Sequence, residues 1–383
     1  MKVDLLIKNG HIIDPSRGVD EIGDIAVVRG KIADISGEKT DAQREIDASG
    51  CIVCPGLINY HGHINYMAAD IATHPDMTHI PTGVTAAVDC GCTGVANCRA
   101  FLNVIQNYLL KVRIYINVSP LGQSTSQFTE ELSPESWSDD QFMRAFEYGG
   151  ERILGLKMRV SRKIVKEKGM RSFDEGLKAS ERFKKPVLIH PTDPTVPQAE
   201  VLSALRGGDV FCHTYMGRGH TIVVDGKVCR EAWEAKKRGV LFDVAHGRTN
   251  FSWKVAEGAF REGFYPQLIG TDTTSKTWNY APIFNLPAVM SKILHLGMPL
   301  NDVIACVTSN AAGAMNWQHE IGTLEAGTVA DIAILKIREG VFPLIDSEGE
   351  CRTLDKLITP QCVVCNGEIM FRDPLFYEGF SIK

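Results

Sequence analysis

Short, almost continuous apolar runs alternate with longer segments of helical periodicity through residues 55–320 of the chain. Near-continuous apolar runs are typical of parallel strands covered on both faces, and apolar residues recurring every three or four positions, as in 173–183 and 231–238, indicate helices. This alternation predicts an α/β fold with a (β/α)8 (TIM) barrel, whose usual length is about 250 residues. The eight expected strands cover residues 56–63, 83–91, 113–120, 153–161, 186–191, 209–215, 240–247 and 266–273.

The two ends of the chain have a different texture, in which short β-rich runs are separated by turn residues. Near the N-terminus the turn signals are Asn9-Gly10, Asp14-Pro15 and Arg29-Gly30. Such signals predict a meander of hairpins, and runs at 330–335 and 361–369 fit further strands of the same sheet or sandwich. We therefore expect a small β-sandwich domain formed by residues 1–54 and 321–383, beside a barrel formed by residues 55–320.

Composition and charge narrow the classes of function. The chain has 383 residues, which fits one large domain with a small one. Its net charge is −5 at pH 7, and it has neither a basic stripe for nucleic acid nor a polybasic segment for a membrane surface. Early charges in Met1–Lys8 argue against a signal peptide, and no apolar run is long enough to span a bilayer. We expect a cytoplasmic homo-oligomer that binds a small-molecule substrate, no nucleic acid and no membrane.

The eleven cysteines are scattered along the chain, which favours reduced thiols over a disulfide framework. Two C-x-x-C pairs, Cys51/Cys54 and Cys362/Cys365, suggest a structural zinc site as one alternative. Both pairs enclose β-branched residues typical of strands, and residues i and i+3 of a strand point to opposite faces. We therefore favour buried thiols that act as small apolar groups, as we do for Cys90 and Cys92.

Polar side chains that can bind metal lie at the ends of the predicted strands. His61-Gly62-His63 closes the first run, and histidines two positions apart lie on the same side of a strand tip. Neutral imidazole suits zinc and its neighbours in the transition series. Because the carboxyl ends of barrel strands meet at one mouth, we expect convergence with four further residues, Lys157, His190, His213 and Asp272. Polar groups that merely line the mouth are the alternative.

At these residues the chain resembles the amidohydrolase superfamily. The matching motifs are Pro55–His63, Gly155–Arg159, Val187–His190, His213–Tyr215, Gly270–Asp272 and, near the return to the terminal strands, Gly322–Asp331. The similarity is greatest to the dihydroorotase-like group and its deacetylase branch, through Gly155–Arg162 and Phe242–Gly247. One departure is Asn59, where many members carry aspartate. Because that position is not a ligand in the family, the change affects only the support of the metal site.

The resemblance implies a binuclear metal centre, with zinc as the expected metal. The more buried ion would be held by His61, His63 and Asp272, and the other by His190 and His213. Lys157 would bridge both as N6-carboxylysine, formed with carbon dioxide or bicarbonate, since a carbamate offers two anionic oxygens whereas an ammonium repels cations. An ion pair between Lys157 and a barrel carboxylate is the alternative.

The resemblance also implies a mechanism. A metal-bridged hydroxide would attack the scissile carbonyl, and Asp272 would act as general base and then as general acid. The reaction would be hydrolysis of an amide or acyl ester bond in a small carboxylate-bearing molecule. Ring opening of a cyclic amide, as in dihydroorotase or hydantoinase, is one alternative. A non-catalytic binding or scaffold relative is another, against which the retention of all six candidate ligands argues.

Two residues are candidates for contact with the substrate. Arg159 shares a strand face with Lys157, so its planar fork can reach a substrate carboxylate, although an ion pair at the barrel rim is an equal alternative. His246 follows the seventh run and would either contact substrate or cap the next segment. The remaining core-region histidines are expected at the surface or in packing positions: His74, His79, His220, His295 and His319.

Overall fold

The central part of the chain folds into a curled parallel sheet in the computed structural model, which describes residues 1–35, 40–125, 127–376 and 380–382. Residues 36–39, 377–379 and 383 of the predicted terminal domain lie outside the described residues. The strands of this sheet pair in the same order as they follow along the chain. They are β6 (Leu57–Gly62), β7 (Val84–Cys90), β8 (Lys111–Asn117), β9 (Ile153–Arg159), β10 (Val187–His190), β11 (Val210–Phe211) and β14 (Leu241–Phe242).

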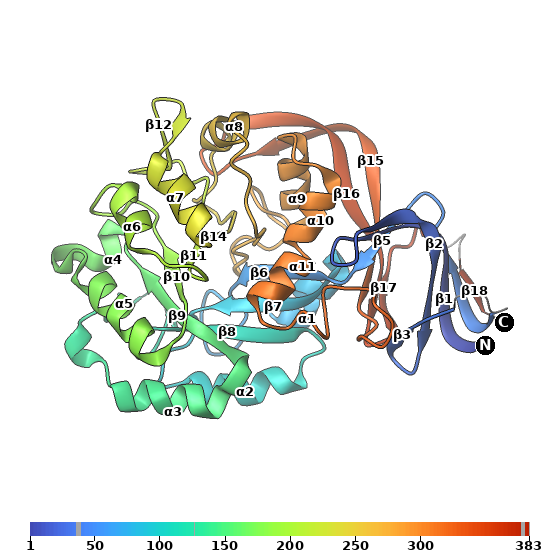
Figure 1. Ribbon diagram of the computed structural model, residues 1–383, viewed down its shortest axis with the longest axis horizontal. Coiled ribbons are helices and arrows are strands. Elements are labelled where there is room, and N and C mark those ends of the chain that lie inside the picture. The colour runs from blue at the N-terminus through green and yellow to red at the C-terminus, as the bar shows by residue number, and fades with distance from the viewer. Residues whose placement is uncertain (36–39, 126, 377–379, 383) are drawn as a thin grey trace.

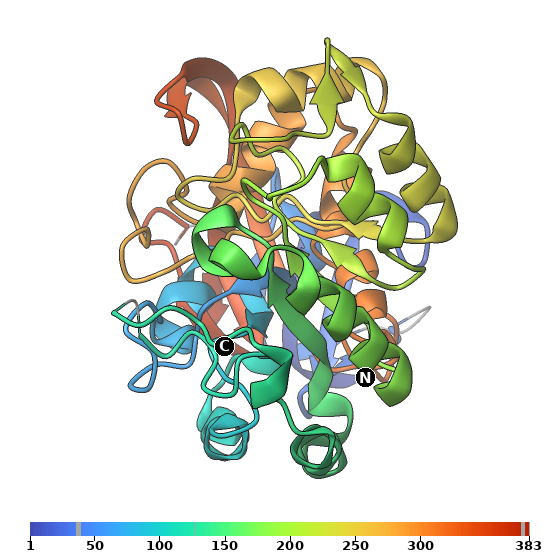
Figure 2. The same cartoon turned by 90° about the vertical axis from the view of Figure 1, so that its left-hand side faces the viewer.

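Helices lie on the outer side of the curled sheet (Figures 1 and 2). The α-helices are α1 (Pro75–His79), α2 (Cys98–Val104), α3 (Asp139–Gly149), α4 (Arg162–Val165), α5 (Arg171–Phe183), α6 (Gln198–Ala204), α7 (Arg230–Arg238), α8 (Trp253–Arg261), α9 (Leu286–His295), α10 (Leu300–Cys306) and α11 (Ser309–Ala314). Short 3-10 helices are η1 (Ile80–Thr82), η2 (Ile105–Asn107), η3 (Pro134–Ser136), η4 (Gly150–Arg152) and η5 (Lys166–Lys168), and a small hairpin joins β12 (Val223–Val224) to β13 (Lys227–Val228). The predicted α/β barrel is confirmed. Among the described residues, none of these helices has the length and apolar character needed to cross a bilayer.

The eighth predicted strand, residues 266–273, is not a regular strand. It closes the barrel through two isolated parallel bridges, Asp243 with Leu268 and Gly62 with Thr273. At Asp272 the backbone adopts a φ of 55°, in the left-handed region, which interrupts a β-ladder. The sequence therefore predicts the position of this segment correctly and its regularity wrongly.

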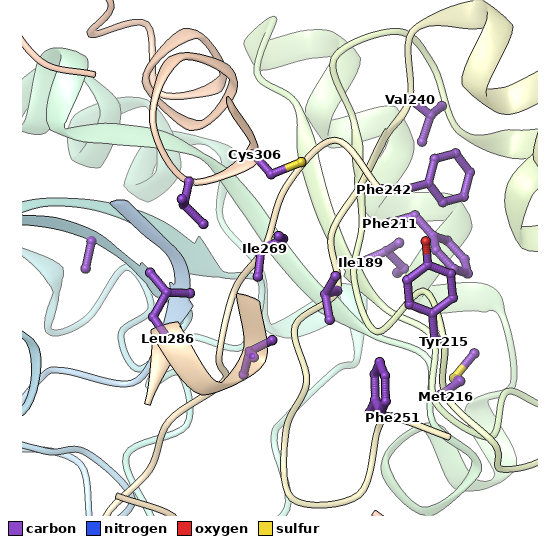
Figure 3. Close-up of a cluster of buried hydrophobic side chains, with 14 of the residues drawn as sticks. Ile189, Phe211, Tyr215, Met216, Val240, Phe242, Phe251, Ile269, Leu286 and Cys306 are labelled. Atoms are coloured by element: carbon purple, nitrogen blue, oxygen red, sulfur yellow. The ribbon is translucent and has the colours of Figure 1, made fainter. Parts of the chain in front are cut away.

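The pleat of the strands decides which side chains face the barrel interior. Ile189 pairs with Phe211, which pairs with Phe242, and this row packs in the large apolar core between strands and helices (Figure 3). Leu188 belongs to the opposite row, which packs in a separate inner cluster, because successive residues of a strand alternate between faces. Lys157 pairs in register with Leu188 and therefore points into the barrel interior.

Both ends of the chain build a second sheet beside the barrel (Figure 1). Its strands are β1 (Lys2–Asp14), β2 (Val19–Val28), β3 (Lys31–Ala33), β4 (Asp41–Asp47), β5 (Ile52–Pro55), β15 (Ile332–Ile345), β16 (Cys351–Cys365), β17 (Glu368–Arg372) and β18 (Phe380–Ile382). The sheet branches at β1, whose first half pairs with β4 and whose second half pairs with β5, so that it folds over a core of its own. This is the predicted domain made from both ends.

One turn predicted in this domain does not form. Strand β1 continues through Asn9-Gly10, where its register with β2 shifts between Ile7 and Gly10. Asn9 has a φ of 59°, so the left-handed residue makes a β-bulge rather than a hairpin. The turn at Arg29-Gly30 forms as predicted, with Val28 paired to Lys31.

The two C-x-x-C pairs are buried in this domain with free thiols. No group of possible metal ligands found among the described residues includes any of the four sulfurs. Burial raises the pKa of the Cys362 and Cys365 thiols to about 12, which keeps them protonated at neutral pH. They behave as the small apolar groups that the strand pattern predicts.

The long hairpin of β15 and β16 reaches from the terminal sheet over α8 and α9 (Figure 1). At its tip, Asp346 Oδ2 accepts a hydrogen bond from the Trp253 amide at the start of α8, at 2.9 Å. Ser347 Oγ accepts from the Phe251 amide at 3.2 Å. The terminal domain thereby holds the loop that follows β14, beside the mouth of the barrel.

Candidate metal centre at the barrel mouth

The structure brings the six predicted ligand residues together at one mouth of the barrel. They are His61 in β6, His63 just after it, Lys157 in β9, His190 at the end of β10, His213 two residues after β11, and Asp272 in the irregular eighth segment. Four are buried: His61, His63, Lys157 and His213. His190 and Asp272 are partly exposed. The widely separated motifs of the sequence thus form one cluster.

Three of these residues offer ligand atoms that all lie within 4.8 Å of one another: His61, His63 and Asp272. His63 Nε2 lies 3.1 Å from Asp272 Oδ1. The Asp272 amide donates to the carbonyl of His61 at 2.7 Å, which fixes the eighth segment against β6. These are the residues expected to hold the more buried ion.

The other expected ligands adjoin this group. His213 Nε2 lies 2.7 Å from His190 Nδ1, and the ring centroids of His61 and His213 are 5.3 Å apart. Lys157 Nζ lies 3.5 Å from His61 Nε2. The two sets of ligands are therefore contiguous through His61.

Hydrogen bonds on the far side of two rings orient their free nitrogens toward the cluster. His61 Nδ1 lies 3.1 Å from Asp243 Oδ2, and His213 Nδ1 lies 2.6 Å from the carbonyl oxygen of Ala245. A carbonyl or carboxylate only accepts, so each Nδ1 carries the ring proton of a neutral imidazole and each Nε2 has a free lone pair. Support of this kind orients metal-binding histidines in proteins.

Burial keeps His61, His190 and His213 neutral. Desolvation lowers the pKa of His61 and His190 well below the ordinary value and lowers that of His213 to about 3. Burial alone would raise the pKa of Asp272, but its contact with His63 and the electrostatic influence of the surrounding histidines outweigh burial and hold the pKa below its ordinary value. The cluster therefore presents neutral imidazole nitrogens and an ionised carboxylate.

Lys157 and Lys292 are both buried, but their surroundings differ. Lys292 Nζ has three acceptors, His246 Nε2 at 2.8 Å, the Pro282 carbonyl at 2.8 Å and the Ile345 carbonyl at 2.6 Å. Lys157 Nζ has only the long contact with His61, and within the described residues no carboxylate forms an ion pair with it. A buried ammonium without acceptors is costly, so the surroundings of Lys157 suit a different chemical state of its amine.

The donor set fits divalent transition-metal ions. Nitrogens with free lone pairs and a carboxylate face one another at hydrogen-bond distance around Asp272 and His213, an arrangement that a cation between them stabilises. Imidazole and carboxylate donors suit zinc.

Unusual backbone turns the ligands inward at the ends of the last strand segments. The backbone φ is 56° at His213, 35° at Ala245 and 55° at Asp272, and residues other than glycine rarely adopt a positive φ. Such conformations cluster at functional sites, where the surrounding structure holds them in place.

Gly91 leaves room for the Lys157 side chain, and we expect Gly91→Ala to disturb the centre. A Cβ at Gly91 would lie 2.6 Å from Lys157 Cγ, and its φ of 91° disfavours any other residue. The backbone strain alone would cost about 1–3 kcal/mol. Thermal unfolding and metal content check this expectation, with Gly313→Ala, where a Cβ meets nothing within 4 Å, as the matched control. Unchanged stability and metal content in Gly91→Ala would contradict it.

Arg159 pairs in register with His190 and lines a cavity of about 280 Å³, whose lining includes none of the six predicted ligands. Its Nη1 donates to Glu130 Oε2 at 2.7 Å and to Gln123 Oε1 at 3.0 Å. Its Nε is buried without a hydrogen-bond partner. The arginine is thus held by one nitrogen, as in the rim ion pair considered from sequence, while part of its fork is left for a further acceptor.

Both ring nitrogens of His246 are bonded within the chain. Its Nε2 lies 2.8 Å from Lys292 Nζ, and its Nδ1 lies 2.9 Å from the carbonyl of Gly247. Its ring stacks on Phe251 with centroids 4.6 Å apart. In this arrangement the ring organises the loop after β14 and has no nitrogen free for a substrate. Burial lowers the pKa of Lys292 to about 7.

Asn59 supports the segment that carries Asp272. Its Oδ1 accepts from the Thr271 amide at 2.9 Å, and its Nδ2 lies 2.9 Å from Thr271 Oγ1 and 3.0 Å from His79 Nε2. The amide therefore takes a supporting role without contact to the ligand nitrogens, and His79 is a buried member of that network.

Sequence reasoning missed several residues whose side chains touch the predicted site residues, among them Asp243, Cys92, Gln123, Glu130, Asn250 and Lys292. For Asp243 there was a usable signal, because it directly follows the seventh strand and so lies at the mouth. Cys92 lies two residues after β7 and had the same signal, but it was assigned to packing. The others lie in loops or, for Lys292, in α9, where no strand-end rule applies.

Comparison with known proteins agrees with this geometry. The sequence model of the amidohydrolase family matches residues 52–370. A deacetylase of Agrobacterium fabrum is 31% identical over 345 residues, which are 88% of this chain and 84% of that protein. A deacetylase of Brucella anthropi is 30% identical over 331 residues, covering 86% of this chain and 82% of its own length.

Solved structures with the same architecture include an adenine deaminase and a dihydroorotase. The adenine deaminase has a TM-score of 0.87 and 28% identity, and the match covers 97% of this chain and 100% of that structure's chain. The dihydroorotase has a TM-score of 0.86 and 27% identity, covering 96% of this chain and 98% of its own. The same barrel with a terminal sheet therefore occurs in a deaminase and in a dihydroorotase.

Proposed function

The chain belongs to the amidohydrolase family of metal-dependent hydrolases, and from that premise we propose that it removes an acyl group from a small carboxylate-bearing molecule. The bond broken is an amide or an acyl ester, as in an N-acyl amino acid or an acetylated hydroxy acid. The observation that carries the proposal is the single cluster of six side chains, in which His63 Nε2 lies 3.1 Å from Asp272 and His190 lies 2.7 Å from His213. Similarity to two deacetylases supports the acyl group as the part removed.

We further propose that the cluster holds two zinc ions. The first would be bound by His61, His63 and Asp272, the second by His190 and His213, and Lys157 would bridge them as N6-carboxylysine. Bound divalent ions supply Lewis acidity toward a carbonyl and make water a stronger acid. Carboxylation replaces a poorly solvated ammonium with an anion, which accounts for a buried lysine that lacks the acceptors of Lys292.

Asp272 would move the proton in the proposed reaction. One carboxylate oxygen faces His63, and the other accepts only a long hydrogen bond of 3.4 Å from Asn250 Nδ2. That second oxygen is available to take the proton of the attacking water and to deliver it to the leaving nitrogen or oxygen. No serine or cysteine nucleophile is required.

Arg159 would bind the carboxylate of the substrate. Its Nη1 is taken by Glu130 and Gln123, while in the part of the chain that the structure describes Nε and Nη2 form no hydrogen bond. Nε and Nη2 form one edge of the guanidinium, which matches the two oxygens of a carboxylate. His246 would act indirectly, by ordering the loop that carries Asn250.

Ring opening of a cyclic amide is the second candidate function. The fold similarity to a dihydroorotase at a TM-score of 0.86 favours it. Both reactions use the same metal centre and differ in the substrate that the cavity accepts.

A hydrolysis screen with zinc-loaded protein prepared in bicarbonate tests the proposal. The panel holds N-acetyl amino acids, O-acetyl hydroxy acids and cyclic amides, with carboxamide analogues as matched controls. We expect release of acetate from one of the first two classes, and little from the carboxamides. Turnover confined to cyclic amides would replace the proposal by the second candidate, and no turnover of any class would contradict both.

Arg159→Lys should raise KM for a carboxylate substrate by about 10- to 100-fold, because lysine keeps a charge beside Glu130 but has no planar fork. The value of kcat should change much less, and turnover of the carboxamide analogue should be unaffected. Steady-state kinetics on both substrates check this. An equal loss on acid and amide would show that Arg159 has no role in recognising the carboxylate.

A further inference from the structure

His63, like His61 and His213, has a hydrogen-bond partner at Nδ1, but that partner is unusual. His63 Nδ1 lies 3.2 Å from the sulfur of Cys92, whereas His61 uses a carboxylate and His213 a carbonyl. Cys92 is fully buried and packs with Ala69 and Ala72, and its thiol also hydrogen-bonds with the Asp89 side chain and the Asn65 backbone.

Asp89 fixes the two segments that carry this pair. Its Oδ1 accepts from the Cys92 amide and its Oδ2 accepts from the Ile64 amide, each at 2.9 Å. One buried carboxylate therefore clamps the backbone next to His63 and the backbone of Cys92. The contact between ring and thiol is thus built into the end of β7 and does not result from chance packing.

A ring that binds a cation through Nε2 must carry its proton on Nδ1, if it is neutral. For His63 the atom that faces Nδ1 is the sulfur of Cys92, at 3.2 Å. Without the sulfur, the Nδ1 proton would lose this partner, and the tautomer with the proton on Nε2 would be favoured, because Asp272 Oδ1 lies 3.1 Å from Nε2. That tautomer has no lone pair for a metal.

We propose that Cys92 is a positioning residue for the metal centre, whose sulfur accepts the Nδ1 proton of His63 and keeps Nε2 available as a ligand. This inference rests on the proposed metal site but not on the substrate. Removing such a partner of a ligand histidine costs about 10- to 100-fold in metal affinity. The role differs from the packing role that the sequence suggested for this thiol.

Zinc affinity of the metal-free full chain, measured by competition with a chromophoric chelator, tests the proposal. We expect Cys92→Ala to bind the ion at least about tenfold more weakly, and Cys92→Ser, whose oxygen can accept the proton, to bind within a few-fold of the parent. Cys98→Ala is the matched control, since Cys98 is also fully buried but its sulfur contacts backbone groups, such as the carbonyl of Val95 at 3.8 Å, instead of a predicted ligand. Cys92→Val, which fills the pocket without an acceptor, replaces the alanine variant if that does not fold.

The d–d spectrum of cobalt-substituted protein provides a second readout. The spectrum should change in Cys92→Ala and stay the same in Cys98→Ala, because only the first substitution removes the partner of a ligand histidine, His63. Equal zinc affinity and equal spectra for Cys92→Ala and Cys98→Ala would overturn the proposal. A parent protein that binds no metal would instead contradict the proposed function, so the two failures are distinguishable.

Discussion

Asp272→Asn is expected to lower kcat by about 10²- to 10⁴-fold while the protein stays folded and retains metal. The amide can still coordinate through its oxygen, but it cannot accept the proton of the attacking water. The fold should tolerate the change because asparagine is among the residues that best accept a φ of 55°.

The measurement combines steady-state kinetics, metal content and thermal unfolding of the variant and its parent. Asn250→Ala is a useful comparison, because Asn250 touches the same carboxylate at 3.4 Å without being the proposed base. It should lose far less activity than Asp272→Asn. Activity of Asp272→Asn within a few-fold of the parent, at equal metal content, would show that another group moves the proton.

Lys157→Ala is expected to lose one of the two ions and to lower kcat by about 10³-fold, because a bridged ion contributes several kcal/mol of charge stabilisation and each 1.36 kcal/mol is tenfold. Short carboxylates such as formate or acetate should restore part of the activity by filling the space between the ions. Elemental analysis and kinetics with and without formate check both expectations.

Labelled bicarbonate examines the state of the amine itself. Carbon-13 NMR of the zinc-loaded parent should show one carbamate signal, absent from Lys157→Ala. Lys292 should give none, because its Nζ is already engaged by His246 and two backbone carbonyls. An unmodified Lys157 amine in active, metal-loaded protein would contradict the bridge while leaving the hydrolase assignment intact.

The fold and the six candidate ligands could be predicted because both follow from rules that act along the strands. Apolar runs mark the strands, and the barrel places every strand end at one mouth, which is why His190 and His213 could be assigned together although no local motif joins them. The eighth segment was wrongly predicted as a regular strand, because its apolar pattern does not show that the backbone of Asp272 adopts a left-handed conformation.

Partners of these residues could not be predicted in the same way. Asp243 and His61 are 182 residues apart, and Glu130 reaches Arg159 from a loop that has no periodic pattern. Their pairing depends on loop conformation and on which side-chain atoms lack another hydrogen-bond partner, and neither can be predicted from a single sequence. Likewise, Asn9-Gly10 has the composition of a turn, and only the continued pairing of β1 with β2 makes it a bulge.

The number of metal ions bound per chain tests the central claim most directly. Purified protein is incubated with excess zinc and bicarbonate, freed of unbound ion, and measured by elemental analysis against protein concentration. We predict two ions per chain, since the cluster offers five donor side chains besides Lys157 and one tetrahedral ion uses only four. A single ion that persists under these conditions would contradict the binuclear centre and the bridging role of Lys157.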